Sequence, residues 1–203
     1  MYWTDSNVGL VNGLVRRANL DGSGVETLVE NLRHPVGITL NTQSGHVYWS
    51  DLVTDKIQRA NLDGTDVVDI LTGIGEAGGL AIDVLGGKLY WSENTTKKIQ
   101  RANLNGTGLE DLVTGLDNPT TIGLDLSEGR MYWTDAPGAI LPTQINRIQS
   151  ANLDGSDVDV VLSGVGSPWG IAVVSVPEPS TLVLLAMGAV GLIGYGWRRR
   201  RAA

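Results

Sequence analysis

The 203-residue sequence contains no cysteine and no phenylalanine. The absence of cysteine excludes a disulfide framework, a thiolate metal site and a cysteine nucleophile, although it does not exclude export. Only two histidines are present, His34 and His46, at opposite ends of one predicted strand. Since a strand rises about 3.3 Å per residue, the two rings are too far apart to share a site. A histidine acid–base pair is therefore not expected.

The sequence also lacks the short motifs of common catalytic sites. It has no G-x-S-x-G elbow, no H-E-x-x-H pair and no phosphate-binding loop. We therefore do not expect an enzyme, and nothing in the residues predicts a cofactor.

Positive charge is scarce in most of the chain. The formal net charge is −7, but residues 1–175 hold 11 Lys and Arg against 21 Asp and Glu, whereas 176–203 hold four Arg and one Glu. An acidic domain argues against nucleic-acid binding. It is compatible with cations, basic partners or neutral glycans and selects none of them.

What the sequence does contain is a recurring four-residue box of the form Tyr-Trp-(Thr/Ser)-(Asp/Glu). Its copies are Tyr2–Asp5, Tyr48–Asp51, Tyr90–Glu93 and Tyr132–Asp135, which start 46, 42 and 42 residues apart. A second box follows each copy, at Arg17–Gly22, Arg59–Gly64, Arg101–Gly106 and Ser150–Gly155. Two boxes that recur in one order at one period indicate a repeat architecture.

Each repeat predicts four short strands. In residues 78–113 they are expected at Gly79–Asp83, Lys88–Ser92, Lys98–Leu104 and Leu109–Val113. Asn105-Gly106 predicts a two-residue hairpin in which both turn residues have positive φ. Four antiparallel strands per repeat of ~42 residues are typical of a propeller blade. We predict an all-β propeller of four four-stranded blades over 1–175.

The two ends of the repeat region predict a latch. Met1 and Tyr2 already belong to the second strand of a blade, whereas Trp169–Val174 has the sequence of an inner strand with no blade behind it. We expect Trp169–Val174 to pair beside Met1–Thr4 and close the ring, which would remove exposed strand edges. No signal peptide precedes the first strand, so for an exported protein we expect further sequence upstream of Met1.

The repeat pattern stops after Ser175, and residues 176–203 form a separate tail. Pro177-Glu178-Pro179 breaks any regular element. Thr181–Trp197 is uncharged and predicts a single transmembrane helix of about 25 Å, slightly short for a ~30 Å hydrocarbon core. The following Arg198, Arg199, Arg200 and Arg201 predict a cytoplasmic end, which would leave the propeller outside.

The boxes resemble the class B repeats of the low-density lipoprotein receptor family, known as YWTD propellers. The resemblance covers residues 2–174 and implies a β-propeller. The usual ring of that family has six blades, whereas four are counted here. Three options stay open: a four-bladed ring, an arc from a truncated larger ring, or an arc completed by another chain.

The tail resembles a PEP-CTERM sorting signal. Its three parts occur in order, namely the Pro177-Glu178-Pro179 motif, an apolar segment and the cluster Arg198–Arg201. The resemblance implies a protein of the envelope or surface of a Gram-negative bacterium that makes exopolysaccharide. It also implies an exosortase-type processing enzyme as a partner, and a membrane anchor before processing.

Repeated polar residues predict structural roles. The box acid and the downstream Arg recur together, so we expect partners such as Asp51 with Arg59 that lock strands or neighbouring blades. The pair is lost in blade four, where Ser150 replaces Arg. Asn41, Asp83 and Asp125 end the predicted inner strands and stand four residues before a glycine. Such residues suit turn capping, and a calcium site in a central channel is the alternative. The repetition of the box aromatics favours packing between blades over a carbohydrate platform.

One face of the propeller is the predicted binding site. There the loop between the second and third strands is longest in blade four, where it contains Ile140 and Leu141. Loops that precede inner strands are expected on the same face, and blade loops are where propellers vary. Trp169 is the one tryptophan of the repeat region outside the boxes. The predicted site comprises Trp169, Ile140, Leu141, Arg33, His34, Asp117 and Asn118.

Two functions from different classes follow. The first is a non-catalytic surface or matrix protein whose propeller is a binding scaffold for exopolysaccharide or a surface protein. The second is a propeller hydrolase or lyase with a metal-assisted site at the channel mouth. The second would require a cluster of acids and histidine at one end of the channel.

Overall fold

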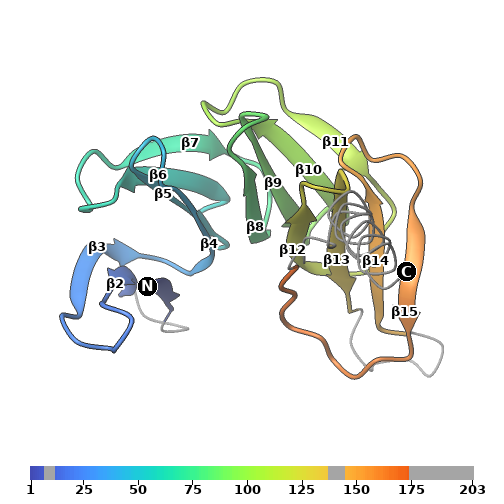
Figure 1. The fold of residues 1–203 in the computed structure, drawn as a ribbon, viewed down its shortest axis with the longest axis horizontal. Coiled ribbons are helices and arrows are strands. Elements are labelled where there is room, and N and C mark those ends of the chain that lie inside the picture. The colour runs from blue at the N-terminus through green and yellow to red at the C-terminus, as the bar shows by residue number, and fades with distance from the viewer. Residues whose placement is uncertain (7–11, 137–144, 174–203) are drawn as a thin grey trace, which may run out of the picture. The chain divides into compact units, whose positions relative to one another are not determined.

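The computed structural model describes residues 1–6, 12–136 and 145–173, and within these ranges the regular structure is entirely β (Figure 1). Blade one contains β1 (Tyr2–Asp5), β2 (Gly13–Arg17) and β3 (Glu26–Leu32). Blade two contains β4 (Pro35–Asn41), β5 (His46–Asp51), β6 (Lys56–Asn61) and β7 (Val68–Thr72). Blade three contains β8 (Ala77–Asp83), β9 (Lys88–Glu93), β10 (Lys98–Asn103) and β11 (Glu110–Val113). Blade four contains β12 (Pro119–Asp125), β13 (Arg130–Asp135), β14 (Arg147–Asn152) and β15 (Asp159–Ser163).

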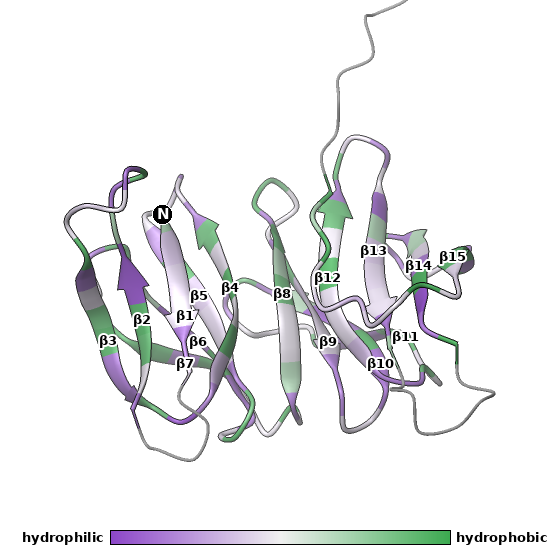
Figure 2. Cartoon of the chain, turned by 90° about the horizontal axis from the view of Figure 1, so that it is seen from below, coloured by the Kyte–Doolittle hydropathy of each residue, from purple (hydrophilic) through white to green (hydrophobic). Residues whose placement is uncertain are grey.

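Each blade is an antiparallel meander in which sequential strands are neighbours. The predicted propeller architecture is confirmed. The inner strands β4, β8 and β12 lie side by side in one row, with the other strands of each blade behind them (Figure 2). Glycines permit this close approach, because a Cβ on Gly37 or Gly79 would lie 2.8 Å from a backbone nitrogen of the next inner strand.

The hydrophobic core consists of three clusters, and each joins two consecutive blades. Trp49, Trp91 and Trp133 are fully buried, one in each cluster. Tyr48 of blade two belongs to the cluster of Trp91 in blade three, and Tyr90 in turn belongs to that of Trp133. A buried aromatic side chain removes about 150–250 Å² from water, which contributes on the order of 4–6 kcal/mol. The box aromatics therefore join the blades, as predicted.

The predicted latch is wrong. Within residues 1–6, 12–136 and 145–173, blade one has three strands and β1 pairs only with β2. Residues 168–173 form no strand. Val173 lies against β12, because a Cβ on Gly123 would come within 2.9 Å of Val173 Cγ2. The inner strands follow one another in chain order, from β4 through β8 to β12. Blades two and three therefore lie between blade one and the segment beside β12, which keeps that segment away from β1 (Figure 1).

Residues 1–173 form one compact unit, which ends before Val174. The predicted membrane helix over Thr181–Trp197 lies outside the described residues, as do the sorting residues Pro177–Pro179 and Arg198–Arg201. Within the described part of the chain, no helix has the length and apolar character needed to span a bilayer.

Candidate functional site

The acid at the end of each box binds backbone amides. Asp51, which is 1% exposed, accepts hydrogen bonds from the amides of Arg33 and His34 at 2.9 and 3.2 Å. It also accepts the amides of Val53 and Thr54, both at 3.1 Å. A buried carboxylate is tolerated when its oxygens are hydrogen-bonded in this way. One side chain therefore joins the loop before an inner strand to the turn after the box.

The predicted ion pair between the box acid and the downstream Arg is wrong. Arg59 lies opposite Tyr48, three residues from Asp51, and an odd offset places two side chains on opposite faces of a sheet. The acids that form ion pairs use other arginines. Asp5 pairs with Arg16 at 3.5 Å and Asp135 with Arg147 at 3.0 Å.

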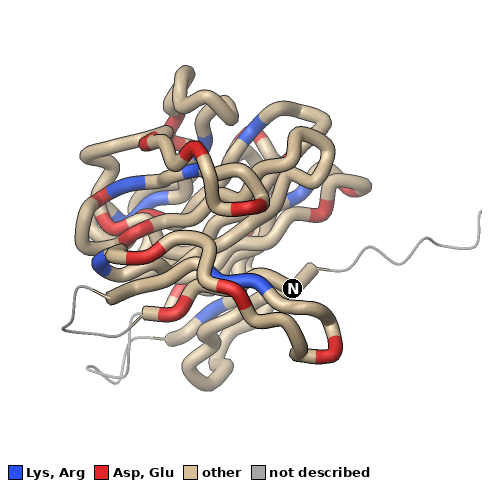
Figure 3. The backbone as a smooth tube through the Cα atoms, turned by 90° about the vertical axis from the view of Figure 1, so that its left-hand side faces the viewer, with Lys and Arg blue, Asp and Glu red and all other residues tan. Residues whose placement is uncertain are grey.

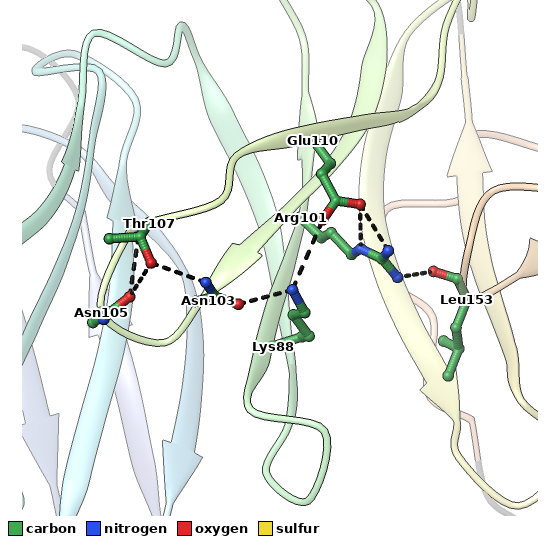
Figure 4. A network of polar contacts seen from close by, with 7 residues as sticks. All are labelled: Lys88, Arg101, Asn103, Asn105, Thr107, Glu110 and Leu153. Carbon is green, nitrogen blue, oxygen red and sulfur yellow. Dashed lines mark hydrogen bonds and ion pairs between the residues drawn. The ribbon is translucent and has the colours of Figure 1, made fainter.

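The arginine of the second box joins neighbouring blades instead. Arg17 donates to the carbonyl oxygen of Leu62 in the next blade at 3.0 Å, and Arg101 donates to that of Leu153 at 2.9 Å. Glu26 and Glu110 hold the two guanidinium groups in place. Figure 4 shows this arrangement for Arg101. The predicted role in locking blades is correct, but the partner is a backbone carbonyl.

The box hydroxyl forms a second bond between blades. Ser50 donates to the carbonyl of Gly78 at 2.8 Å, and Ser92 donates to that of Thr120 at 2.9 Å. Thr4 does the same with Val36. Thr134 of blade four contacts the hydroxyls of Thr120 and Thr121 in its own blade. The first three boxes are thus attached to the inner strand of the following blade.

The turn of the second box differs from the predicted hairpin. The link from β10 to β11 spans 104–109, and Gly106 has positive φ whereas Asn105 does not. The Asn105 side chain accepts from the amide and hydroxyl of Thr107, and Asn103 and Lys88 extend this network (Figure 4). An Asx turn therefore replaces the tight two-residue turn.

The polar residues that end the inner strands cap turns, as predicted. Asn41 accepts the amide of Ser44 at 3.1 Å, and Asp83 accepts that of Gly86 at 2.7 Å. Asp125 accepts the hydroxyl and amide of Ser127. The hydroxyl bond, followed by the amide bonds, lowers the pKa of Asp125. No three Asp, Glu or His side chains in the described ranges are placed to hold a metal ion together.

The loops before β4 and β12 supply four residues of the predicted binding site. Their amides are bound by box acids: Arg33 and His34 by Asp51, Asp117 and Asn118 by Asp135. The Asp117 carboxylate forms an ion pair with Arg147, and the Asn118 side chain donates to the carbonyl of Ala136 at 2.8 Å. The Arg33 side chain is exposed. These residues therefore lie at one end of their blades, with most polar groups engaged.

Trp169 is the most exposed part of the predicted site. Trp169 is 78% exposed, whereas the box tryptophans of blades two to four are fully buried. By alignment of the repeats, Trp169 corresponds to Val36, Gly78 and Thr120, near the beginning of the inner strands. Ile140 and Leu141 lie outside the described residues. The structure thus leaves Trp169 accessible and gives Ile140 and Leu141 no position.

Acidic and basic positions are interspersed over the described chain (Figure 3). Lys98 with Asp111 and Lys56 with Asp69 form equivalent ion pairs at 2.7 Å in adjacent blades. The hydrogen bond from Lys98, followed by that from Gln100, lowers the pKa of Asp111. Exposed pairs of this kind contribute little binding or stability each.

Two family models match segments of the chain. Residues 45–84 match the model of the low-density lipoprotein receptor repeat class B, and residues 175–201 match that of the PEP-CTERM protein-sorting motif. The chain therefore carries YWTD repeats on a β-propeller fold, followed by a PEP-CTERM sorting motif. That motif implies export, envelope sorting and processing by an exosortase-type system. No curated protein matches the sequence.

Solved structures resemble the chain in fold. A chain of the nidogen/laminin complex is 23% identical with a TM-score of 0.68, covering 80% of this chain and 61% of that chain. A gluconolactonase from Xanthomonas campestris is 23% identical with a TM-score of 0.55, and the match covers 64% of this chain and 48% of the gluconolactonase. The calcium-binding protein regucalcin from Agrobacterium tumefaciens is 17% identical with a TM-score of 0.54, and the match covers 64% of this chain and 46% of regucalcin. The chain thus spans about three fifths or less of these propellers, and the likeness shows the fold alone.

Proposed function

We propose that this chain is a non-catalytic binding scaffold of the cell surface or extracellular matrix of a Gram-negative bacterium. The tail would direct the propeller to the envelope, where an exosortase-type enzyme processes it. The repeats would then present a rigid surface outside the cell. The PEP-CTERM match at 175–201 next to a β-propeller is the observation that supports this reading most directly.

The engagement of the polar residues supports a scaffold rather than an enzyme. The acids Asp51 and Asp135 are buried and bound to backbone amides, and Ser50 and Ser92 are bound between blades. A catalytic acid or base must reach a substrate proton within about 2.6–3.2 Å. These groups are occupied in holding the fold, so the repeated polar residues are not free for chemistry.

Trp169 is the proposed contact for an extracellular glycan. An indole ring presents a large, rigid apolar surface with one polar N–H, a combination suited to binding sites that are partly wet. Its 78% exposure leaves that surface open, and its position near the beginning of the inner-strand segment places it at the end of the blades where Arg33 is also exposed. We propose exopolysaccharide of the producing cell as the ligand.

The experiment compares Trp169→Ala with Leu85→Ala in the purified full chain. Leu85 is 88% exposed in the turn after β8, at the opposite end of the blades, so it is a matched control. Binding to the producer's isolated exopolysaccharide is measured by co-sedimentation. We expect Trp169→Ala to reduce binding at least tenfold and Leu85→Ala to leave it unchanged. Equal binding by both folded variants would reject Trp169 as the contact.

Sorting is tested separately, on the protein recovered from the cell surface. Mass spectrometry of its C-terminus should show chains that end near Pro177-Glu178-Pro179 and lack Arg198–Arg201. An intact arginine terminus on every surface molecule would contradict processing.

A further inference from the structure

In blades two to four, one face of the blade packs against the preceding blade. Among the described residues, the equivalent face of blade one is exposed. Leu62, Leu104 and Leu153 of the second box pack against the core between their blade and the preceding one, whereas the equivalent Leu20 is 89% exposed. The turn glycines repeat this difference. A Cβ on Gly64, Gly106 or Gly155 would overlap a carbonyl of the preceding blade, but a Cβ on Gly22 would meet nothing within 4 Å.

Blade four exposes the opposite face. Leu162 in β15 is 53% exposed, whereas its equivalents Leu71 and Val113 are 9% and 7% exposed. Val161 is 47% exposed and corresponds to Leu28, Ile70 and Leu112, the residues that lie against the turn glycines of the following blade. Tyr132 is only partly buried, whereas Tyr48 and Tyr90 are covered by the next blade. This face therefore carries the residues that, in blades one to three, contact the following blade.

The strands at the two ends are also complementary. Blade one lacks an inner strand within the described residues, so the edge of β1 that faces away from β2 is unpaired there. Val173 lies against Gly123 of β12, as consecutive inner strands lie against each other, although residues 168–173 are not part of a sheet. Their spacing fits, because Pro168 follows Ser163 by five residues, as Ala77 follows Thr72 and Pro119 follows Thr114.

We propose that blade four of one copy of this chain binds blade one of a second copy, and that residues 168–173 of the first copy pair with the edge of β1 that is free among the described residues of the second. The occupant of each exposed face is therefore this same protein. The proposal concerns no glycan and no sorting step, but it shares Trp169 with the proposed function. Both hold together if Trp169 stays accessible at the start of the added strand, as the equivalent Val36 is 37% exposed at the start of β4.

Consecutive blades meet three times within the chain, and the contacts of these interfaces predict those between two copies. Val161 would receive Gly22 of the second copy, as Ile70 receives Gly106. Tyr132 would be covered by the second copy's blade one, as Tyr90 is covered by blade four. In the register of β12 with β13, Ala172 would lie opposite Tyr2 of the second copy. Added strands of this kind gain affinity from backbone hydrogen bonds.

Such an association is head-to-tail, since the two faces differ. It generates a closed ring if the rotation between copies closes and an open filament if it does not. Both outcomes place the same residues in contact, so both fit the proposal.

The first experiment measures the mass of the full chain by light scattering over a dilution series. Leu20→Arg is the test variant and Leu85→Arg is the control, because the two leucines are 89% and 88% exposed and neither change should affect folding. Every variant keeps the tail, so any association through the tail is common to all. We expect multimers for the wild type and Leu85→Arg, and at least a tenfold weaker association for Leu20→Arg. A monomeric wild type, or equal association of all three, would overturn the proposal.

The second experiment uses the absence of native cysteine. Ala172→Cys and Tyr2→Cys proteins are prepared separately, mixed and oxidised. We expect a crosslinked pair in the mixture and little crosslinking of either protein alone. A double variant that crosslinks within single chains would instead show the intramolecular latch and overturn the proposal, as would the absence of any crosslink in the mixture.

Discussion

At the scale of the residue, the side chains of the repeated boxes each have one structural task. The tryptophan fills the core and the tyrosine packs against the next blade. The hydroxyl binds a carbonyl of that blade in blades one to three, and the arginine does so in blades one and three. The acid binds backbone amides in blades two to four. Blade three departs from this rule with Glu93 in place of Asp, and Glu93 binds the amides of Thr95 and Thr96. Gly75 stands where the other blades have Arg33 and Asp117.

Gly75 and Glu93 should therefore be coupled. Glu93 is fully buried, and a Cβ on Gly75 would overlap its carboxylate. We expect Gly75→Ala to cost about 1–3 kcal/mol of unfolding free energy through positive φ and this overlap. In the Glu93→Asp background the cost should fall by about 0.5–1 kcal/mol, because the φ strain is common to both backgrounds. A double-mutant cycle by urea unfolding measures the coupling, and a value of zero would contradict it.

The ion-paired acids make stability depend on pH. The hydrogen bond from Lys56 lowers the pKa of Asp69, and that from Lys98 lowers the pKa of Asp111. When the folded pKa lies below the unfolded one, the unfolded state binds more protons as the pH falls. The stabilisation is therefore complete above the ordinary Asp pKa of about 3.9 and is lost as the pH falls through the folded value.

We expect the two pairs to give a small decrease in the unfolding free energy between about pH 5 and pH 2, since exposed pairs stabilise little each. Asp111→Asn should flatten this decrease, and Asp69→Asn should flatten it similarly, since the two pairs are equivalent. Urea unfolding at pH 6, 4 and 3 measures the slope. An unchanged slope in both variants would show that these pairs do not contribute.

At the scale of the element, the blade is the unit that cannot bury its own surface. Its strands satisfy each other's backbone groups, but its aromatic residues are covered only by a neighbour. The turn of the second box contributes to this contact, because its glycine permits the backbone of the preceding blade to approach. Conformational freedom and close packing thus select glycine at the same position.

Two glycines separate these effects. Gly106 and Gly22 have φ values of +83° and +84°, but only Gly106 lies against the carbonyl of Ile70. We expect Gly22→Ala to cost about 1 kcal/mol from backbone strain and Gly106→Ala to cost at least about 1–3 kcal/mol more from overpacking. Thermal and urea unfolding of dilute protein compare them. Equal losses would show that the turn glycine is required for its conformation alone.

At the scale of the whole molecule, the chain consists of a repeat unit over 1–173 and a tail that is not part of it. The three core clusters of the described residues lie between consecutive blades of the repeat unit. The stability of the repeat unit should therefore be independent of the sorting motif, whose task is to direct the protein to the envelope.

Deletion of 176–203 tests this independence. We expect the shortened chain to unfold at the same temperature as the full chain within about 2 °C, because residues 1–173 form a compact unit of their own. Calorimetry on both proteins gives the comparison. A fall of 5 °C or more would show that the tail contributes to the fold.

The sequence by itself determined the repeat, the strands and the class of fold. Its period and boxes are local signals, and packing between blades repeats the same residue at the same position, so Trp49, Trp91 and Trp133 could be identified as core. The caps at Asp83 and Asp125 were equally predictable, because an Asx turn closes within four residues.

The tertiary structure alone decided which groups meet between blades and what lies at the two ends. The sequence pairs Asp51 with Arg59 by recurrence, but their strand register places them on opposite faces, and the arginine position bonds to a carbonyl far along the chain. Trp169–Val174 has the sequence of an inner strand, yet a strand is defined by the neighbour it pairs with. The chain order of the blades places this segment beside β12 and far from β1, so its partner is decided by the arrangement of blades in space.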